Sequence, residues 1–143
     1  MLKVKPRRKL PILVRDVMVT PPITAPQDTS ISKAANIMYE NGIGSLLIVD
    51  SENKLVGIVT ERDMLYALAK ESENLNKPVW RIMTENPITA KPEEPLVEAL
   101  KRMRDAAVRH LPIVDREGKP IGIISMRDLV DALVTLISIL GAL

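Results

Sequence analysis

Apolar and polar positions follow the same order twice along the chain. In the first copy, residues 23–25 form a short β-prone segment, and the Pro21-Pro22 pair before it excludes a helix. Thr29 is a suitable N-cap for a helix that runs to about Asn41, and Gly42 suits a left-handed stop after it. The apolar residues of this helix fall on one face: Ile31, Ala34 and Met38.

Two aliphatic runs, 45–49 and 54–59, follow around the polar turn 50–53. Their length and spacing predict a β-hairpin. Because the runs are almost continuously apolar, we expect both faces of the strands to be covered. A second helix is expected to begin near Glu61, so each copy consists of an extended segment, a helix, a hairpin and a helix.

The second copy repeats these elements 65 residues later, with residues 87–90 and 113–115 identical to 22–25 and 48–50. Pro95 stands at the preferred first position of a helix, and the last helix is expected to begin near Met126. Each copy is too small to bury its own core comfortably, so the repeat predicts two like units packed on each other. The predicted fold class is α/β (α+β), with pseudo-equivalent clefts at the junction of the units.

Five regions are expected along the chain. They are a basic arm (1–13), a first unit (14–70), a polar linker (71–78), a second unit (79–135) and an apolar tail (136–143). The end of the chain has too much apolar surface for a free segment, which indicates burial against the body or against a second subunit.

The composition limits the chemistry. The chain has no Cys, which excludes disulfides, thiolate zinc sites and a Cys nucleophile and fits a reducing compartment. His110 is the only histidine, which excludes a His-rich metal site. The first residues lack the apolar run of a signal peptide, and no segment reaches the roughly 18 apolar residues of a membrane span. We therefore expect a cytoplasmic protein without a metal site or membrane insertion.

The net charge of +2 conceals a basic arm. Five cations and no acids precede residue 10, while the remaining 15 cations face 18 acids. A mildly acidic body is not typical of a dedicated nucleic-acid domain, and the arm lacks aromatic residues for base stacking. We interpret the arm as a solvated tail, with contact to a nucleic acid or an acidic partner as the alternative.

A Gly-x-x-Thr/Ser-x-x-Asp motif closes each hairpin. Its members are Gly57, Thr60 and Asp63 in the first unit and Gly122, Ser125 and Asp128 in the second. A hydroxyl at the N-cap and an acid three residues later form a capping box, so a structural role is one interpretation. The other is ligand binding, because a carboxylate at a helix N-terminus can accept both hydroxyls of a ribose. Arg62 and Arg127, which capping does not need, add forked cations suited to phosphate.

Together these segments resemble tandem CBS domains, also called a Bateman module, of the stand-alone archaeal or bacterial type. The resemblance covers about residues 14–133 and rests also on Val17-Met18, which is matched by Ile82-Met83. It implies two pseudo-two-fold-related β-α-β-β-α units packed through their sheets. It further implies two clefts that bind adenosine ligands, namely AMP, ADP, ATP or, in some members, S-adenosylmethionine.

The resemblance implies roles for individual residues. Asp63 and Asp128 would hold ribose, with Thr60 and Ser125 near the sugar or the phosphate. The backbone of two segments would recognise adenine: Ile23, Thr24 and Ala25 in the Asp128 cleft, and Ile88, Thr89 and Ala90 in the Asp63 cleft.

Arg109 and His110 occupy strand positions that carry phosphate contacts in the family. His110, alongside Pro112, is expected to face the Asp63 cleft, and Arg109 the Asp128 cleft. A structural role for a lone histidine at a strand edge is the alternative. Because the first unit has Gly44-Ser45 at these positions, the clefts should differ in charge and affinity.

The expected function is that of a non-enzymatic sensor of adenine nucleotides that signals energy state to an effector protein in trans. A homodimer is expected. The chain has no Gly-x-x-x-x-Gly-Lys-Ser/Thr loop, no His-Glu-x-x-His and no convincing Ser-His-Asp set, so an enzyme is not expected. The alternatives are a sensor of S-adenosylmethionine, a nucleic-acid binder and a purely structural dimerisation module.

Overall fold

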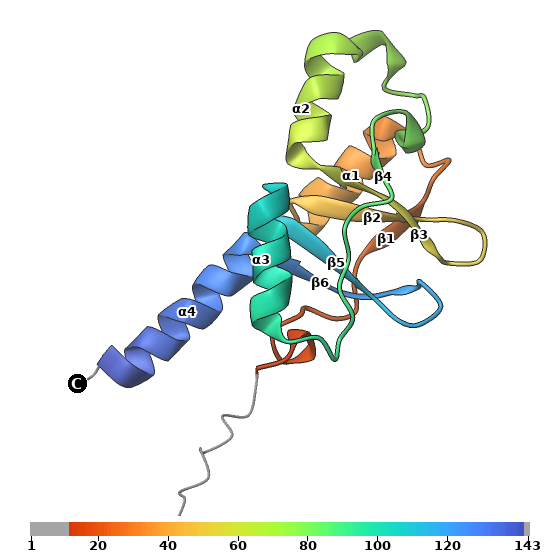
Figure 1. Ribbon diagram of the computed structural model, residues 1–143. Helices are drawn as coiled ribbons and strands as arrows, with labels where there is room; N and C mark the ends of the chain where they lie inside the picture. Colours follow the sequence, from red (N-terminus) through yellow and green to blue (C-terminus); the bar gives the residue numbers. More distant parts are fainter. Residues whose placement is uncertain (1–11, 142–143) are drawn as a thin grey trace, which may run out of the picture.

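The computed structural model describes residues 12–141 of the chain (Figure 1). The basic arm falls almost entirely outside this range. The first unit contains β1 (Thr24–Pro26), α1 (Ile31–Asn41), β2 (Ser45–Val49), β3 (Leu55–Thr60) and α2 (Glu61–Lys70). The second contains β4 (Thr84–Glu85), α3 (Leu96–Ala106), β5 (His110–Val114), β6 (Pro120–Ser125) and α4 (Met126–Gly141). The described residues also form three short 3-10 helices, one before β1 (Val14–Asp16) and two between α2 and β4 (Ser72–Asn74 and Val79–Arg81).

The starts of the helices α1 and α3 differ from the prediction by one residue. The N-cap of α1 is Ser30, whose hydroxyl accepts a hydrogen bond from the backbone N–H of Lys33 at 3.1 Å, and not Thr29. Pro95 occupies the same N-cap position before α3 instead of the first helical position. Proline is tolerated there because it has no N–H, while its extended backbone directs the chain into the helix.

Both of these helices end in the left-handed region. Gly42 has φ +60°, as the sequence predicts. Its counterpart Ala107 has φ +55°, which an alanine side chain disfavours. The same chain reversal is therefore retained in the second unit with a less suitable residue.

The sheets of the two units have the same order. In the first, β1 pairs with β2 in parallel, β2 pairs with β3 in antiparallel, and β4 adds an outer edge next to β3. In the second, β5 and β6 form the hairpin, with a parallel bridge from Ala90 to Ile113 and an antiparallel bridge from Val19 to Ile123. The predicted hairpins are confirmed, and every residue of β2 is buried.

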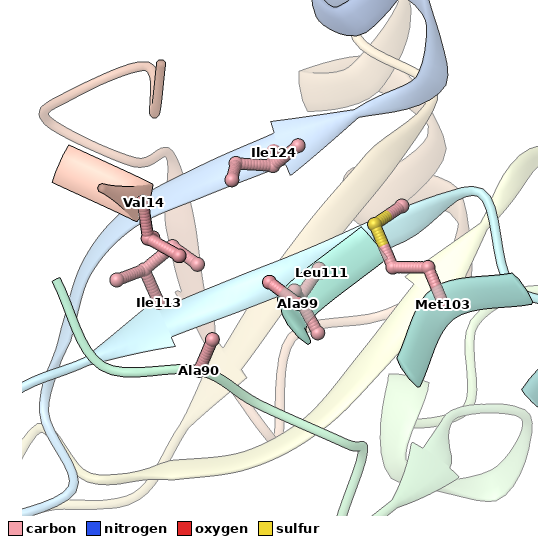
Figure 2. Packing of buried hydrophobic residues seen from close by; sticks show 7 residues of the cluster. All are labelled: Val14, Ala90, Ala99, Met103, Leu111, Ile113 and Ile124. Carbon is pink, nitrogen blue, oxygen red and sulfur yellow. The ribbon is translucent and has the colours of Figure 1, made fainter. Parts of the chain in front are cut away.

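The two units exchange their first residues. Thr84 lies near the start of the second repeat but pairs with Ile58 in the first sheet, just as Val19, near the start of the first repeat, forms a bridge to Ile123 in the second sheet. The exchange extends into the cores, because Val79 is buried in the first unit. Val14 is buried in the second, where Figure 2 shows it among its neighbours: Ala90, Ala99, Met103, Leu111, Ile113 and Ile124. Each core is thus completed by a segment of the other repeat.

Within the described residues, the apolar stretch from residue 136 onwards belongs to α4, which continues to Gly141 and projects away from the sheets (Figure 1). Its large apolar side chains are 49–69% exposed from Val130 onwards. Among the described residues, burial of this stretch against the body is therefore wrong, and burial against a second subunit stays a prediction. Within residues 12–141, no helix has the length and apolarity needed to cross a membrane.

Candidate functional site

Two cavities of similar size lie between the units. One, of about 610 Å³, contains Asp63 and is called the Asp63 cavity here; the other, of about 590 Å³, contains Asp128 and is called the Asp128 cavity. The Asp63 cavity combines the hydroxyl and acid residues of the first motif with residues 107–110 of the second unit. The Asp128 cavity combines those of the second motif with residues 42–45 of the first unit. Both volumes lie in the range of small-molecule sites, so each could hold a nucleoside ligand.

The aspartate of each motif closes a capping box. Asp63 Oδ2 accepts hydrogen bonds from the N–H of Thr60 at 2.8 Å and from its hydroxyl at 3.1 Å. Asp128 Oδ2 accepts the same two bonds from Ser125, at 3.0 and 2.7 Å. In both cases the described residues donate only to Oδ2, so Oδ1 keeps its lone pairs for a ligand in the cavity. Capping and ligand binding are therefore compatible roles of one carboxylate.

The glycine of each motif makes room for a methionine. A Cβ atom on Gly122 would lie 2.7 Å from the sulfur of Met18, and one on Gly57 would overlap the sulfur of Met83. Met18 lies near the start of the first repeat and Met83 near the start of the second, so each glycine contacts the exchanged segment of the other repeat. In each motif, the glycine therefore allows the two repeats to approach closely. The Thr or Ser residue and the Asp residue of the same motif line the cavity.

The structure brings the predicted residues of each cavity together only in part. The Asp63 cavity is lined by Thr60, Arg62, Asp63 and Ile88. The Asp128 cavity is lined by Ile23, Ser125, Arg127 and Asp128. Five other predicted residues line neither: Thr24, Ala25, Thr89, Ala90 and Pro112.

Four of the five belong to the sheets, because Thr24 and Ala25 lie in β1, Pro112 lies in β5, and Ala90 forms a bridge to Ile113. Ala25, Ala90 and Pro112 are buried, with Ala25 paired in β1 and Pro112 in β5. The carbonyl of Thr89 accepts a hydrogen bond from Arg102 at 2.7 Å. Only the first residue of each predicted adenine segment thus reaches a cavity, together with the residues that precede it.

Arg109 and His110 each line both cavities. The sequence predicts His110 at the Asp63 cavity only and Arg109 at the Asp128 cavity only. Burial lowers the pKa of His110 below its ordinary value, and Arg109 lowers it further, while the carboxylates of Glu61 and Asp128 offset part of the shift. The imidazole is therefore mainly neutral at pH 7, and it can donate from one nitrogen and accept at the other.

Several residues outside the predicted set also line the cavities. Glu61 lines both, Asp131 lines only the Asp128 cavity, and Asn86 lines only the Asp63 cavity. Asp131 lies three residues after Asp128 on α4, so helical spacing could have placed it near the motif. Among residues 12–141, no cluster of three potential ligands could hold a metal ion.

Comparison with known proteins identifies both units. The family model described as "CBS domain" matches residues 14–70 and 79–135. A homoserine O-acetyltransferase of Methanohalobium evestigatum is 36% identical over 116 residues, which cover 81% of this chain and 23% of that protein. An uncharacterised 17.7 kDa protein of Acidianus ambivalens is 36% identical over 84% of this chain and 72% of its own length. The chain thus spans about a quarter of the first relative and most of the second.

Solved structures share the fold. The CBS domain pair of protein MJ0100, in complex with 5′-methylthioadenosine and S-adenosyl-L-methionine, has a TM-score of 0.80 at 36% identity and covers 87% of this chain and 97% of its own. The CBS domain protein PAE2072 from Pyrobaculum aerophilum, complexed with AMP, has a TM-score of 0.77 at 29% identity. That match covers 82% of this chain and 90% of the other. Both structures contain adenosine compounds.

Proposed function

Because the chain belongs to the CBS domain family, we propose that it is a non-enzymatic regulatory module that binds adenine nucleotides in its two cavities. The ligands are AMP, ADP or ATP, and occupancy is passed on to an effector protein in trans as a signal of energy state. The signal requires that the ligand binds two arrangements of the protein unequally.

One observation carries the proposal. Each cavity contains an aspartate that uses Oδ2 for the capping box and leaves Oδ1 to accept from a ribose. An arginine directly precedes each aspartate and lines the same cavity, which supplies a cation for a phosphate. The AMP complex of PAE2072 supports this assignment by similarity.

S-adenosylmethionine is the second candidate ligand. The CBS domain pair of MJ0100, with the same fold at 36% identity, is described in complex with this compound and with 5′-methylthioadenosine. Both compounds contain the ribose and adenine that the two aspartate sites would recognise.

The test is isothermal titration calorimetry of the purified protein with AMP, ADP, ATP and S-adenosylmethionine. Saturable binding of a nucleotide supports the proposal, and preferential binding of S-adenosylmethionine supports the second candidate. If none of the four ligands binds at millimolar concentration to a folded protein, the proposal is wrong and a purely structural module becomes the better interpretation.

A further inference from the structure

The centre of the site contains one acid that the two cavities share. Glu61 is the first residue of α2, and its N–H donates to the carbonyl of Gly44 at 3.1 Å. A Cβ atom on Gly44 would lie 3.4 Å from Oε1 of Glu61 and 3.1 Å from Nε2 of His110. The carboxylate and the imidazole therefore converge on the space that glycine leaves open.

The repeat does not duplicate this acid. The residue equivalent to Glu61 in the second unit is Met126, which lines the Asp128 cavity without a charge. A single carboxylate from the first unit thus faces both cavities, so its charge acts on a ligand in either one.

Neither cavity has the positive excess that a polyphosphate needs. In the Asp63 cavity, the carboxylates of Glu61 and Asp63 balance the guanidinium groups of Arg62 and Arg109. In the Asp128 cavity, Arg109 and Arg127 face three acids, namely Glu61, Asp128 and Asp131. His110 adds little charge at pH 7 because burial favours its neutral form.

The geometry points to Glu61 as a specificity-determining residue that makes both cavities select adenosine ligands with little negative charge on the 5′ side, so that AMP binds better than ATP. This inference rests on the proposed function and refines it. A phosphate monoester brings up to about two negative charges, and each further phosphate adds to the repulsion by the central carboxylate. Adenosine, which has no phosphate, does not experience this repulsion.

The test compares adenosine, AMP, ADP and ATP by calorimetry with the wild type and Glu61→Gln. The amide keeps the size of the side chain and removes the charge. We expect ATP to bind Glu61→Gln about tenfold more tightly than it binds the wild type, with a smaller gain for AMP and no change for adenosine. Asp105→Asn is the matched control, because this exposed acid lines neither cavity and pairs with Arg104 at 3.0 Å.

Asp131→Asn provides a second, local test. Because Asp131 lines only the Asp128 cavity, its substitution should improve ATP binding at one site, whereas Glu61→Gln should improve it at both. If Glu61→Gln leaves the ratio of ATP to AMP affinity unchanged while both ligands bind, the inference is wrong and the proposed function stands. If adenosine and all three nucleotides fail to bind the wild type, both are wrong.

Discussion

The sulfur of Met18 lies against the α-carbon face of Gly122, although the two residues belong to opposite repeats. A methyl group on Gly122 would lie 2.7 Å from that sulfur and 3.1 Å from the carbonyl oxygen of Val19. We therefore expect Gly122→Ala to lower the free energy of unfolding by about 1–3 kcal/mol, as overpacking does. Urea denaturation would measure this loss.

A double-mutant cycle separates the two neighbours of the added methyl group. In Met18→Ala, which removes the sulfur, Gly122→Ala should cost less than in the wild type. An equal cost in both backgrounds would assign the effect to the backbone of Val19 and contradict the role of Met18.

Asp63→Asn and Asp128→Asn should separate capping from ligand binding. An asparagine can accept part of the capping hydrogen bonds, so each variant should lose at most about 1 kcal/mol of stability. Nucleotide affinity should fall about 10- to 100-fold, because charged hydrogen bonds to ribose contribute about 1.5–3 kcal/mol. Calorimetry measures the affinities, and the 2′,3′-dideoxy ligand should show a similar loss with the wild type and little further loss with the variants. Unchanged nucleotide affinity in both folded variants would leave the aspartates as caps only.

His110 should make the protein less stable in mild acid. Its pKa is lower in the folded protein than in the unfolded chain, so the unfolded chain binds more protons below about pH 6.5. The contribution of the neutral His110 imidazole to the free energy of unfolding is fully present above this pH. It is lost as the pH falls toward the folded pKa, by at most about 1.4 kcal/mol per pH unit. Denaturation at pH 7.5 and 5.5 measures the difference, which should shrink in His110→Gln. The same pH dependence in the variant would contradict the role of His110.

A homodimer is expected through α4. Val130, Leu133, Ile137 and Leu140 are all more than half exposed, and their spacing of three, four and three residues is that of a coiled coil. The β-branched residues Val130 and Ile137 alternate with leucine in this spacing, which favours a coiled coil of two helices. Light scattering at micromolar concentration should give the mass of a dimer for the wild type and a lower mass for Ile137→Glu. Thr135→Glu, on another face of the helix, is the control, and a monomeric wild type would contradict the prediction.

The two cavities should bind nucleotide unequally. The sequence suggests this from Arg109 and His110, but these residues line both cavities. The cavities differ in charge because Asp131 lines only the Asp128 cavity. Calorimetry should therefore resolve two affinities or half occupancy. Two identical, independent sites would count against this prediction.

The sequence predicts the elements of each repeat well because local signals determine them. The left-handed stop at Gly42 and the starts of the helices at Glu61 and Met126 agree with the structure. A shift of one residue at Ser30 arises because Thr29 and Ser30 are both good N-caps, and only the bond to Lys33 distinguishes them.

The sequence predicts the site less completely, because its shape depends on how the units meet. The motif identifies the aspartates, but the position of Arg109 and His110 at both cavities depends on how closely they approach Gly44 of the other unit. The exchange of Val14 and Val79 is likewise invisible in a repeat that aligns without gaps. Local patterns describe each unit but do not determine which unit a connecting segment packs on.

The exchange of first residues also determines which half of the molecule holds the two ends of the described chain. Val14, near one end of the described chain, is anchored in the second core, and α4 leaves the same unit at the other end. Both ends of the described chain are therefore attached to the second half. The two cavities lie between that half and the other, so a displacement of the second half would change the lining of both cavities.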